Sequence, residues 1–188
     1  MSNENRKNVH FDAPVIIGFV LLSALVMIIN MMTNGESTKA AFSVYQSDYH
    51  SIGFYIRLFG HVLGNASWSD YLRNTLYILV LGSMLEARFK SVNMLIMIIV
   101  TAFVTGLIYS FVGESQLCGA SCIVFMLMCL AALSVIKDNV IPFTFIMFII
   151  IYLLNVMIVH ENVAGTRTGI IGGACGALFG YVISMRKK

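Results

Sequence analysis

The sequence predicts an all-helical integral membrane protein whose helices form one bundle. Of its 188 residues, 59% are hydrophobic and only 11% are charged. A soluble domain of this length cannot bury so much apolar surface, because its exterior needs more polar cover. The apolar residues also gather into six long runs, and a helix needs about 20 such residues to cross a bilayer core. We therefore expect six transmembrane helices.

The predicted spans are residues 14–33, 71–88, 92–112, 119–136, 141–159 and 168–185, preceded by a polar tail, residues 1–13. The first run is too long for a signal-peptide core and has no small-residue cleavage site, so it is a retained helix. The second is the least uniform, because Arg73 and Asn74 lie near its start. Glu86 and Arg88, at its other end, are expected to have a structural role. Residues 14–188 then form a single membrane domain.

Lysine and arginine set the orientation of the spans. One set of ends carries eight of these residues, namely Arg6, Lys7, Arg88, Lys90, Lys137, Arg186, Lys187 and Lys188, and the other carries four, namely Lys39, Arg57, Arg73 and Arg167. Positively charged ends stay on the cytoplasmic side. Both termini of this multi-pass protein are therefore expected in the cytoplasm, with the starts of spans 119–136 and 168–185 at the outer face.

Residues 34–70, between the first two spans, are long for a connection. They include the stretch AFSVYQSDYHSIGFYIRLFGHVLG (41–64), which is rich in aromatic and aliphatic residues. Such a segment prefers a membrane interface to water, so residues 52–63 are expected to lie on the outer leaflet. The alternative is a disordered external loop.

Small residues recur in the last span, TGIIGGACGALFGYV (168–182). Gly172, Gly176 and Gly180 are four residues apart and form one smooth helix face, which lets another helix approach closely. The helix of residues 119–136 is the expected neighbour, because both spans begin at the outer face.

Metal, cofactor and nucleic-acid binding have little support. The four cysteines lie in or beside apolar runs without histidines at metal-ligand spacing: Cys118, Cys122, Cys129 and Cys175. Such cysteines behave as small hydrophobic side chains. No basic stripe with interleaved aromatic residues is present, so no nucleic-acid partner is expected.

Four stretches, read together, carry a family resemblance. They are FGHVLGNASWSDYLRNTLYILVLGSMLEARFKS (59–91), CGASCIVFMLM (118–128), VIKDNVIPFTFIMFIIIYLLN (135–155) and GIIGGACGALFG (169–180). The chain resembles, over about residues 50–185, the rhomboid family of intramembrane serine proteases, especially its six-helix bacterial form. The resemblance implies a rhomboid-like bundle with a long outer loop after its first helix, in a bacterial cell membrane. It also implies a transmembrane segment as substrate or client.

The resemblance assigns roles to several residues. Ser121, two residues after Gly119, matches the nucleophile, whose proton is taken in the family by a histidine on the last helix. A serine hydroxyl is a weak nucleophile without such a base. Asn74, and Asp70 four residues before it, match the asparagine and histidine that stabilise the oxyanion. The alternative for Asn74 is a clamp between two helices, because a polar side chain within a span needs a partner.

Three matched positions depart from the family pattern. Gly169 stands where the family has the histidine base. Asp70 stands where the family has the oxyanion histidine, and a carboxylate there would repel a developing negative charge unless protonated. Cys122 follows Ser121 where the family has glycine, and adds bulk where close approach is expected.

Another histidine would have to replace the missing base. The chain has His10, His50, His61 and His160, of which His10 is on the predicted cytoplasmic side. A base must come within about 3 Å of the hydroxyl. An interfacial histidine with its polar tip in water is the plainer interpretation for the others.

These observations favour a pseudoprotease that binds transmembrane segments or partner proteins without cutting them. The alternative is an active intramembrane serine endopeptidase that uses Ser121 with a different base. A small-solute transporter has less support, because no span carries paired buried charges and no inverted repeat is visible.

Overall fold

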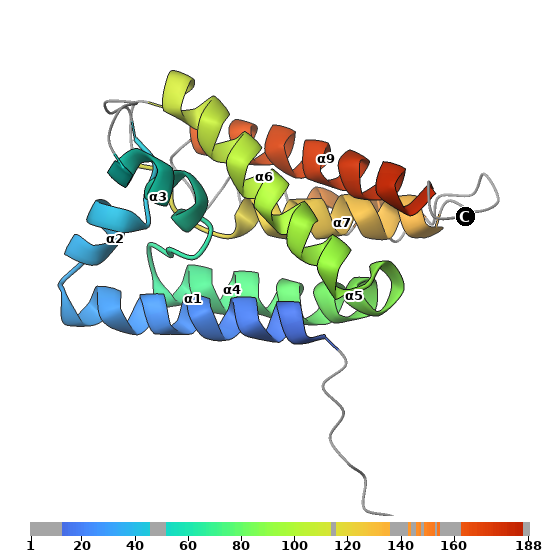
Figure 1. Ribbon diagram of the computed structural model, residues 1–188, viewed down its shortest axis with the longest axis horizontal. Helices are drawn as coiled ribbons and strands as arrows, with labels where there is room; N and C mark the ends of the chain where they lie inside the picture. Colours follow the sequence, from blue (N-terminus) through green and yellow to red (C-terminus); the bar gives the residue numbers. More distant parts are fainter. Residues whose placement is uncertain are drawn as a thin grey trace, which may run out of the picture.

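The protein is described by a computed structural model that covers residues 13–45, 52–113, 116–135 and 163–185, with 143, 146–147, 149–152 and 154. Within these residues the regular elements are helices (Figure 1). They are α1 (Pro14–Met32), α2 (Glu36–Ala41), α3 (Ile52–Gly60), α4 (Trp68–Tyr77), the π-helical turn η1 (Ile78–Gly82), α5 (Ser83–Phe89), α6 (Ser91–Val112), α7 (Ser121–Val135) and α9 (Val163–Met185).

The second predicted span is built from α4, η1 and α5, which follow one another without a break. It begins at Trp68, earlier than the predicted residue 71, because Ser67 caps the helix. The Ser67 hydroxyl oxygen accepts a hydrogen bond of 3.1 Å from the backbone N–H of Asp70. This bond satisfies one of the N–H groups that a helix start leaves without a partner.

Glu86 and Arg88 each bind the end of a neighbouring helix. The buried Glu86 carboxylate accepts hydrogen bonds from the backbone N–H groups of Val15 (3.0 Å) and Ile16 (2.9 Å), in the first turn of α1. Arg88 donates a hydrogen bond of 3.1 Å to the Ser134 carbonyl, near the end of α7. Both charges have the sign that the helix dipole favours at that end. The two residues have the structural role expected of them.

The long helix α9 packs along both α6 and α7 (Figure 1). Its predicted glycine face meets α6, where a methyl group would overlap Thr105 at Gly172, Thr101 at Gly176 and Met97 at Gly180. The reversed order of these contacts makes α6 and α9 antiparallel. The helix approached by this face is thus mainly α6, and the prediction that it is the helix carrying Ser121 is wrong for this face.

A second glycine face of α9 approaches α7. A methyl group at Gly173 would lie 2.8 Å from the carbonyl oxygen of Cys122 and 3.0 Å from the backbone nitrogen of Met126. Gly169, one turn earlier, also has Cys122 as its neighbour. The first turns of α7 therefore lie beside the second and third turns of α9.

The connection between α1 and α4 contains two short helices, α2 and α3, at one end of the bundle (Figure 1). α3 packs against α6, buries Phe54 and Leu58, and exposes Ile52, Tyr55 and Ile56. An amphipathic helix with exposed apolar side chains is typical of a membrane interface. The location of residues 52–63 at that interface stays a prediction.

Two helices of the described part, α1 and α6, are long and apolar enough to cross a bilayer, and α7 is apolar but shorter. The predicted fifth span, 141–159, lies largely outside the described residues, although its described positions are helical. Most of the predicted tail and the last three residues also lie outside them. The count of six spans and the cytoplasmic termini stay predictions.

Candidate functional site

A pocket of about 100 Å³ lies where the starts of α4, α7 and α9 meet. It is lined by Ala66, Asp70, Asn74, Gln116, Leu117, Cys118, Gly119, Ser121, Gly165 and Thr166. Four residues singled out in the sequence, Ser121, Asn74, Asp70 and Gly119, thus share one pocket although they come from separate parts of the chain.

The segment leading into α7 is held by the region between α1 and α4. Val44 and Leu117 form an isolated antiparallel bridge and exchange two backbone hydrogen bonds of 2.9 Å. The N–H of Gly119 donates a third, also 2.9 Å, to the carbonyl of His61. Gly119 has φ +129°, which residues with a side chain rarely adopt. A glycine at this position therefore lets the chain turn into α7 at Ser121.

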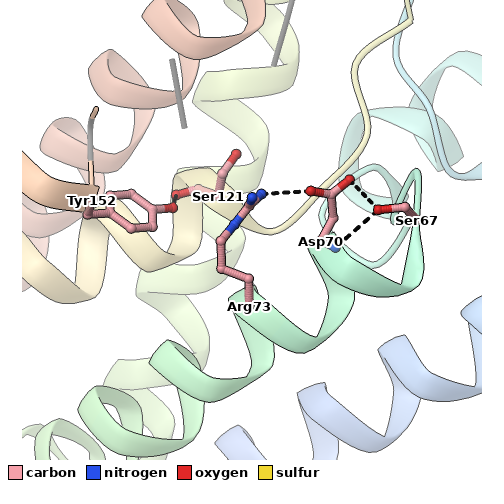
Figure 2. A network of polar contacts seen from close by, with 5 residues as sticks. All are labelled: Ser67, Asp70, Arg73, Ser121 and Tyr152. Atoms are coloured by element: carbon pink, nitrogen blue, oxygen red, sulfur yellow. Dashed lines mark hydrogen bonds and ion pairs between the residues drawn. The ribbon is translucent and has the colours of Figure 1, made fainter. Parts of the chain in front are cut away.

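Asp70 belongs to a polar network at the start of α4 (Figure 2). Its carboxylate forms an ion pair of 2.8 Å with Arg73 and accepts a hydrogen bond of 2.8 Å from the Ser67 hydroxyl. Ser67 and Asp70 thus bond reciprocally, in a variant of the capping box. From the sequence, the resemblance to the family predicts only an oxyanion position for Asp70. The spacing Ser67-x-x-Asp70 was the signal that would have revealed its capping role.

Ser121 is the first residue of α7 and is half-buried. The hydroxyl of Tyr152 donates a hydrogen bond of 3.2 Å to the Ser121 backbone carbonyl (Figure 2). The Tyr152 ring packs edge-on against Tyr77, with centroids 5.2 Å apart. Tyr152 was not singled out in the sequence, because its spacing there gives no signal that it reaches Ser121.

Gly169, at the position where the family resemblance predicts the base, has no side chain. An added Cβ would lie 3.7 Å from Cys122 Cβ and 3.9 Å from Cys122 Cα. These are ordinary van der Waals distances, so the backbone has room for the first atom of a side chain. The nearest neighbour of position 169 is thus the residue that directly follows Ser121.

His61 is the one histidine within the described residues, since His10, His50 and His160 lie outside them. It is fully buried, and its Nδ1–H donates a hydrogen bond of 3.0 Å to the Leu58 carbonyl. Its ring lies near Gly106 of α6 and is not part of the pocket lining. Burial lowers the pKa of His61 from 6.5 to about 4, so the ring is neutral at physiological pH.

This burial predicts a pH-dependent stability. Below pH 6.5 the unfolded chain takes up a proton at His61, whereas the folded protein does so only near pH 4. The free energy of unfolding should therefore fall by up to about 3 kcal/mol as the pH drops through this window. Thermal unfolding of the detergent-solubilised protein at pH 7 and pH 4.5 would measure the loss. The variant His61→Gln should lose less stability between these two pH values than the wild type does. An unchanged pH dependence in this variant would contradict the attribution of the loss to His61.

The described residues offer few other reactive groups. They contain no group of three or more His, Cys, Asp or Glu side chains that could hold a metal ion. Burial, and then the nearby Asp70 carboxylate, raise the pKa of the Cys118 thiol to about 11. A protonated thiol is a poor nucleophile, which leaves Ser121 as the nucleophile candidate of the pocket.

The apolar helices α1 and α6, together with exposed leucine, isoleucine and phenylalanine side chains, define a helical membrane protein with a polar pocket at one end. The profile of the Rhomboid domain matches residues 53–187. The chain belongs to the rhomboid family. The matched range includes every residue that lines the pocket. Comparison with curated proteins finds no match.

Proposed function

We propose that this rhomboid-family membrane protein is a pseudoprotease, which binds a transmembrane segment or partner protein without cutting it. The observation that carries the proposal is the glycine at position 169, next to Cys122 and hence beside Ser121. A serine without a base keeps its proton and stays weakly nucleophilic. Among the described residues that line the pocket, none is a histidine that would replace the base.

The oxyanion side of the pocket supports the same proposal. An active site of this kind needs hydrogen-bond donors directed at the developing negative charge. At Asp70 the pocket has a carboxylate, which Arg73 and Ser67 hold in place as an acceptor. The carboxylate can accept a hydrogen bond from a bound client, but it would repel a developing oxyanion.

Labelling with a fluorophosphonate probe tests the proposal. We expect no labelling of Ser121 in the wild-type protein and no cleavage of transmembrane substrates, under conditions in which an active rhomboid protease is labelled. The matched control is Ser121→Ala. Labelling of the wild type that disappears in this control would overturn the pseudoprotease proposal.

An active serine endopeptidase is the second candidate. The observation that favours it is that Ser121 and Asn74, the nucleophile and oxyanion positions, line the same pocket. Its base would come from a histidine that is not part of the described pocket lining. If the wild type were labelled, substitution of His160 and His61 in turn would identify that base.

We also propose six transmembrane spans with both termini in the cytoplasm, supported by the charge distribution and the family. Reporter fusions at residues 40, 90, 115, 138 and 163 should alternate in the order out, in, out, in, out. A cytoplasmic signal at residue 115 would contradict this topology, because it would put the starts of α7 and α9 on the inner side.

A further inference from the structure

The pocket beside Ser121 has the opposite polarity to an oxyanion site. Among the described residues that line it, Asp70 is the one with a formal charge. The negative charge of Asp70 reaches the pocket interior, because it contributes to the raised pKa of the Cys118 thiol. A carboxylate accepts hydrogen bonds and attracts cations. The pocket therefore favours a positively charged donor.

Asn74 supplies a second, independent acceptor. It lies one turn after Asp70 on the same face of α4, lines the pocket and is 3% exposed. Its Oδ1 is buried and has no hydrogen-bond partner within the described residues. An unsatisfied buried acceptor is costly, and a ligand that donates to it recovers that cost. The amide torsion is broad and roughly two-fold, so the oxygen can turn toward a donor in the pocket.

Two features of the site act in the opposite direction. The starts of α4, α7 and α9 each place a partial positive charge of about half a unit near the pocket. The Arg73 guanidinium carries a full positive charge, but it is bonded to Asp70 and does not line the pocket. Asp70 thus contributes the full charge among the described residues that line the pocket, and the partial charge of each helix start is smaller.

We propose that this pocket receives the ammonium group of a lysine side chain from a client protein. The inference rests on the proposed function and names the chemistry by which the client is recognised. A lysine ammonium is a compact charge with three donors on a flexible stem. A pocket of about 100 Å³ has room for this group and the last methylenes of the stem. An ethanolamine lipid headgroup fits less well, because Asp70 would repel its phosphate.

The charge preference of the pocket can be measured at Cys118, which lines it. The probes are three methanethiosulfonates with the same ethyl linker: 2-aminoethyl (cationic), 2-hydroxyethyl (neutral) and 2-sulfonatoethyl (anionic). Mass spectrometry of the wild-type protein in an uncharged detergent would follow modification at Cys118 alone. After correction for reaction with a free thiol, we expect the cationic reagent to react roughly fivefold faster than the anionic one. Equal rates, or a faster anionic reagent, would overturn the proposal.

Two variants identify the charge responsible. Asp70→Asn keeps the size of the side chain and should abolish the preference for the cation. Arg73→Gln removes the counter-charge and should increase it. A change in the thiolate fraction affects all three reagents equally, so the ratio of rates reports the pocket potential. A preference that is unchanged in both variants would contradict the role of Asp70.

A protection experiment identifies the source of the ammonium. A lysine-containing peptide that represents the outer end of a transmembrane segment should protect Cys118 from the neutral reagent, whereas the same peptide with acetyl-lysine should not. Protection by phosphatidylethanolamine nanodiscs, but not by phosphatidylcholine nanodiscs or the peptide, would show that the pocket binds a lipid headgroup. That result would overturn the proposal of a client lysine. Protection by none of them would also overturn it. These outcomes are independent of fluorophosphonate labelling, which tests the loss of catalysis itself.

Discussion

The triple variant Gly169→His, Asp70→His, Cys122→Gly is expected to be labelled at Ser121 by a fluorophosphonate probe that leaves the wild type unlabelled. The variant restores the residues of the family pattern at all three departures. The expected effect is large, because loss of one member of a serine-protease triad can reduce turnover by up to about a million-fold. The backbone has room at position 169, and Cys122→Gly removes the side chain that lies nearest to it.

The single variant Gly169→His is expected to restore little. Its imidazole would still meet the Cys122 side chain, and Asp70 would still present a carboxylate to the oxyanion. In the triple variant, the substitution of Asp70 also removes the ion pair with Arg73 and the hydrogen bond from the Ser67 hydroxyl. We expect this loss to lower the free energy of unfolding by about 1 kcal/mol. A time course of probe fluorescence on gels would compare these variants.

The control for this prediction is the triple variant with Ser121→Ala, which should not be labelled. A triple variant that elutes from size-exclusion chromatography at the same volume as the wild type, and is therefore folded, but remains unlabelled would contradict the prediction. It would mean that the pocket departs from an active site in more than these three residues.

Glu86→Ala is expected to destabilise the protein by about 3–6 kcal/mol, because a hydrogen bond to a charged group contributes about 1.5–3 kcal/mol and the Glu86 carboxylate accepts two. It would leave the N–H groups of Val15 and Ile16 without their acceptor. α1 has no substitute, since Ala13 at its N-cap provides no side-chain hydrogen bond.

Thermal unfolding in detergent would measure the loss, and hydrogen exchange of a peptide containing Val15 and Ile16 would locate it. Glu86→Gln is the matched variant, and it should lose less because its amide oxygen still accepts. Arg88→Ala is the second control and should cost less, since Arg88 is exposed and makes a single bond to Ser134. Equal losses in Glu86→Ala and Arg88→Ala would contradict the capping role of Glu86.

Part of the candidate site could be read from the sequence. The spacing of the family pattern indicates three parts of the site. They are the short motif at Gly119 and Ser121, the position of Asn74, and position 169. The structure places Ser121, Asn74 and Asp70 in one pocket with Gly119. The pairing of Asp70 with Arg73 and the contact of Tyr152 with Ser121 were not anticipated. Both depend on side-chain directions that a linear pattern does not specify.

By itself, the sequence determined the class of the protein, because apolar runs long enough for a bilayer leave little choice other than membrane helices. It also determined that a glycine occupies position 169, where the resemblance to the family predicts the histidine base. Only the tertiary structure decided which helix each glycine face meets. α9 packs against two helices, and residues one position apart on it point about 100° apart. Gly172 therefore contacts α6 while Gly173 contacts α7, and no periodicity in the sequence distinguishes these two neighbours.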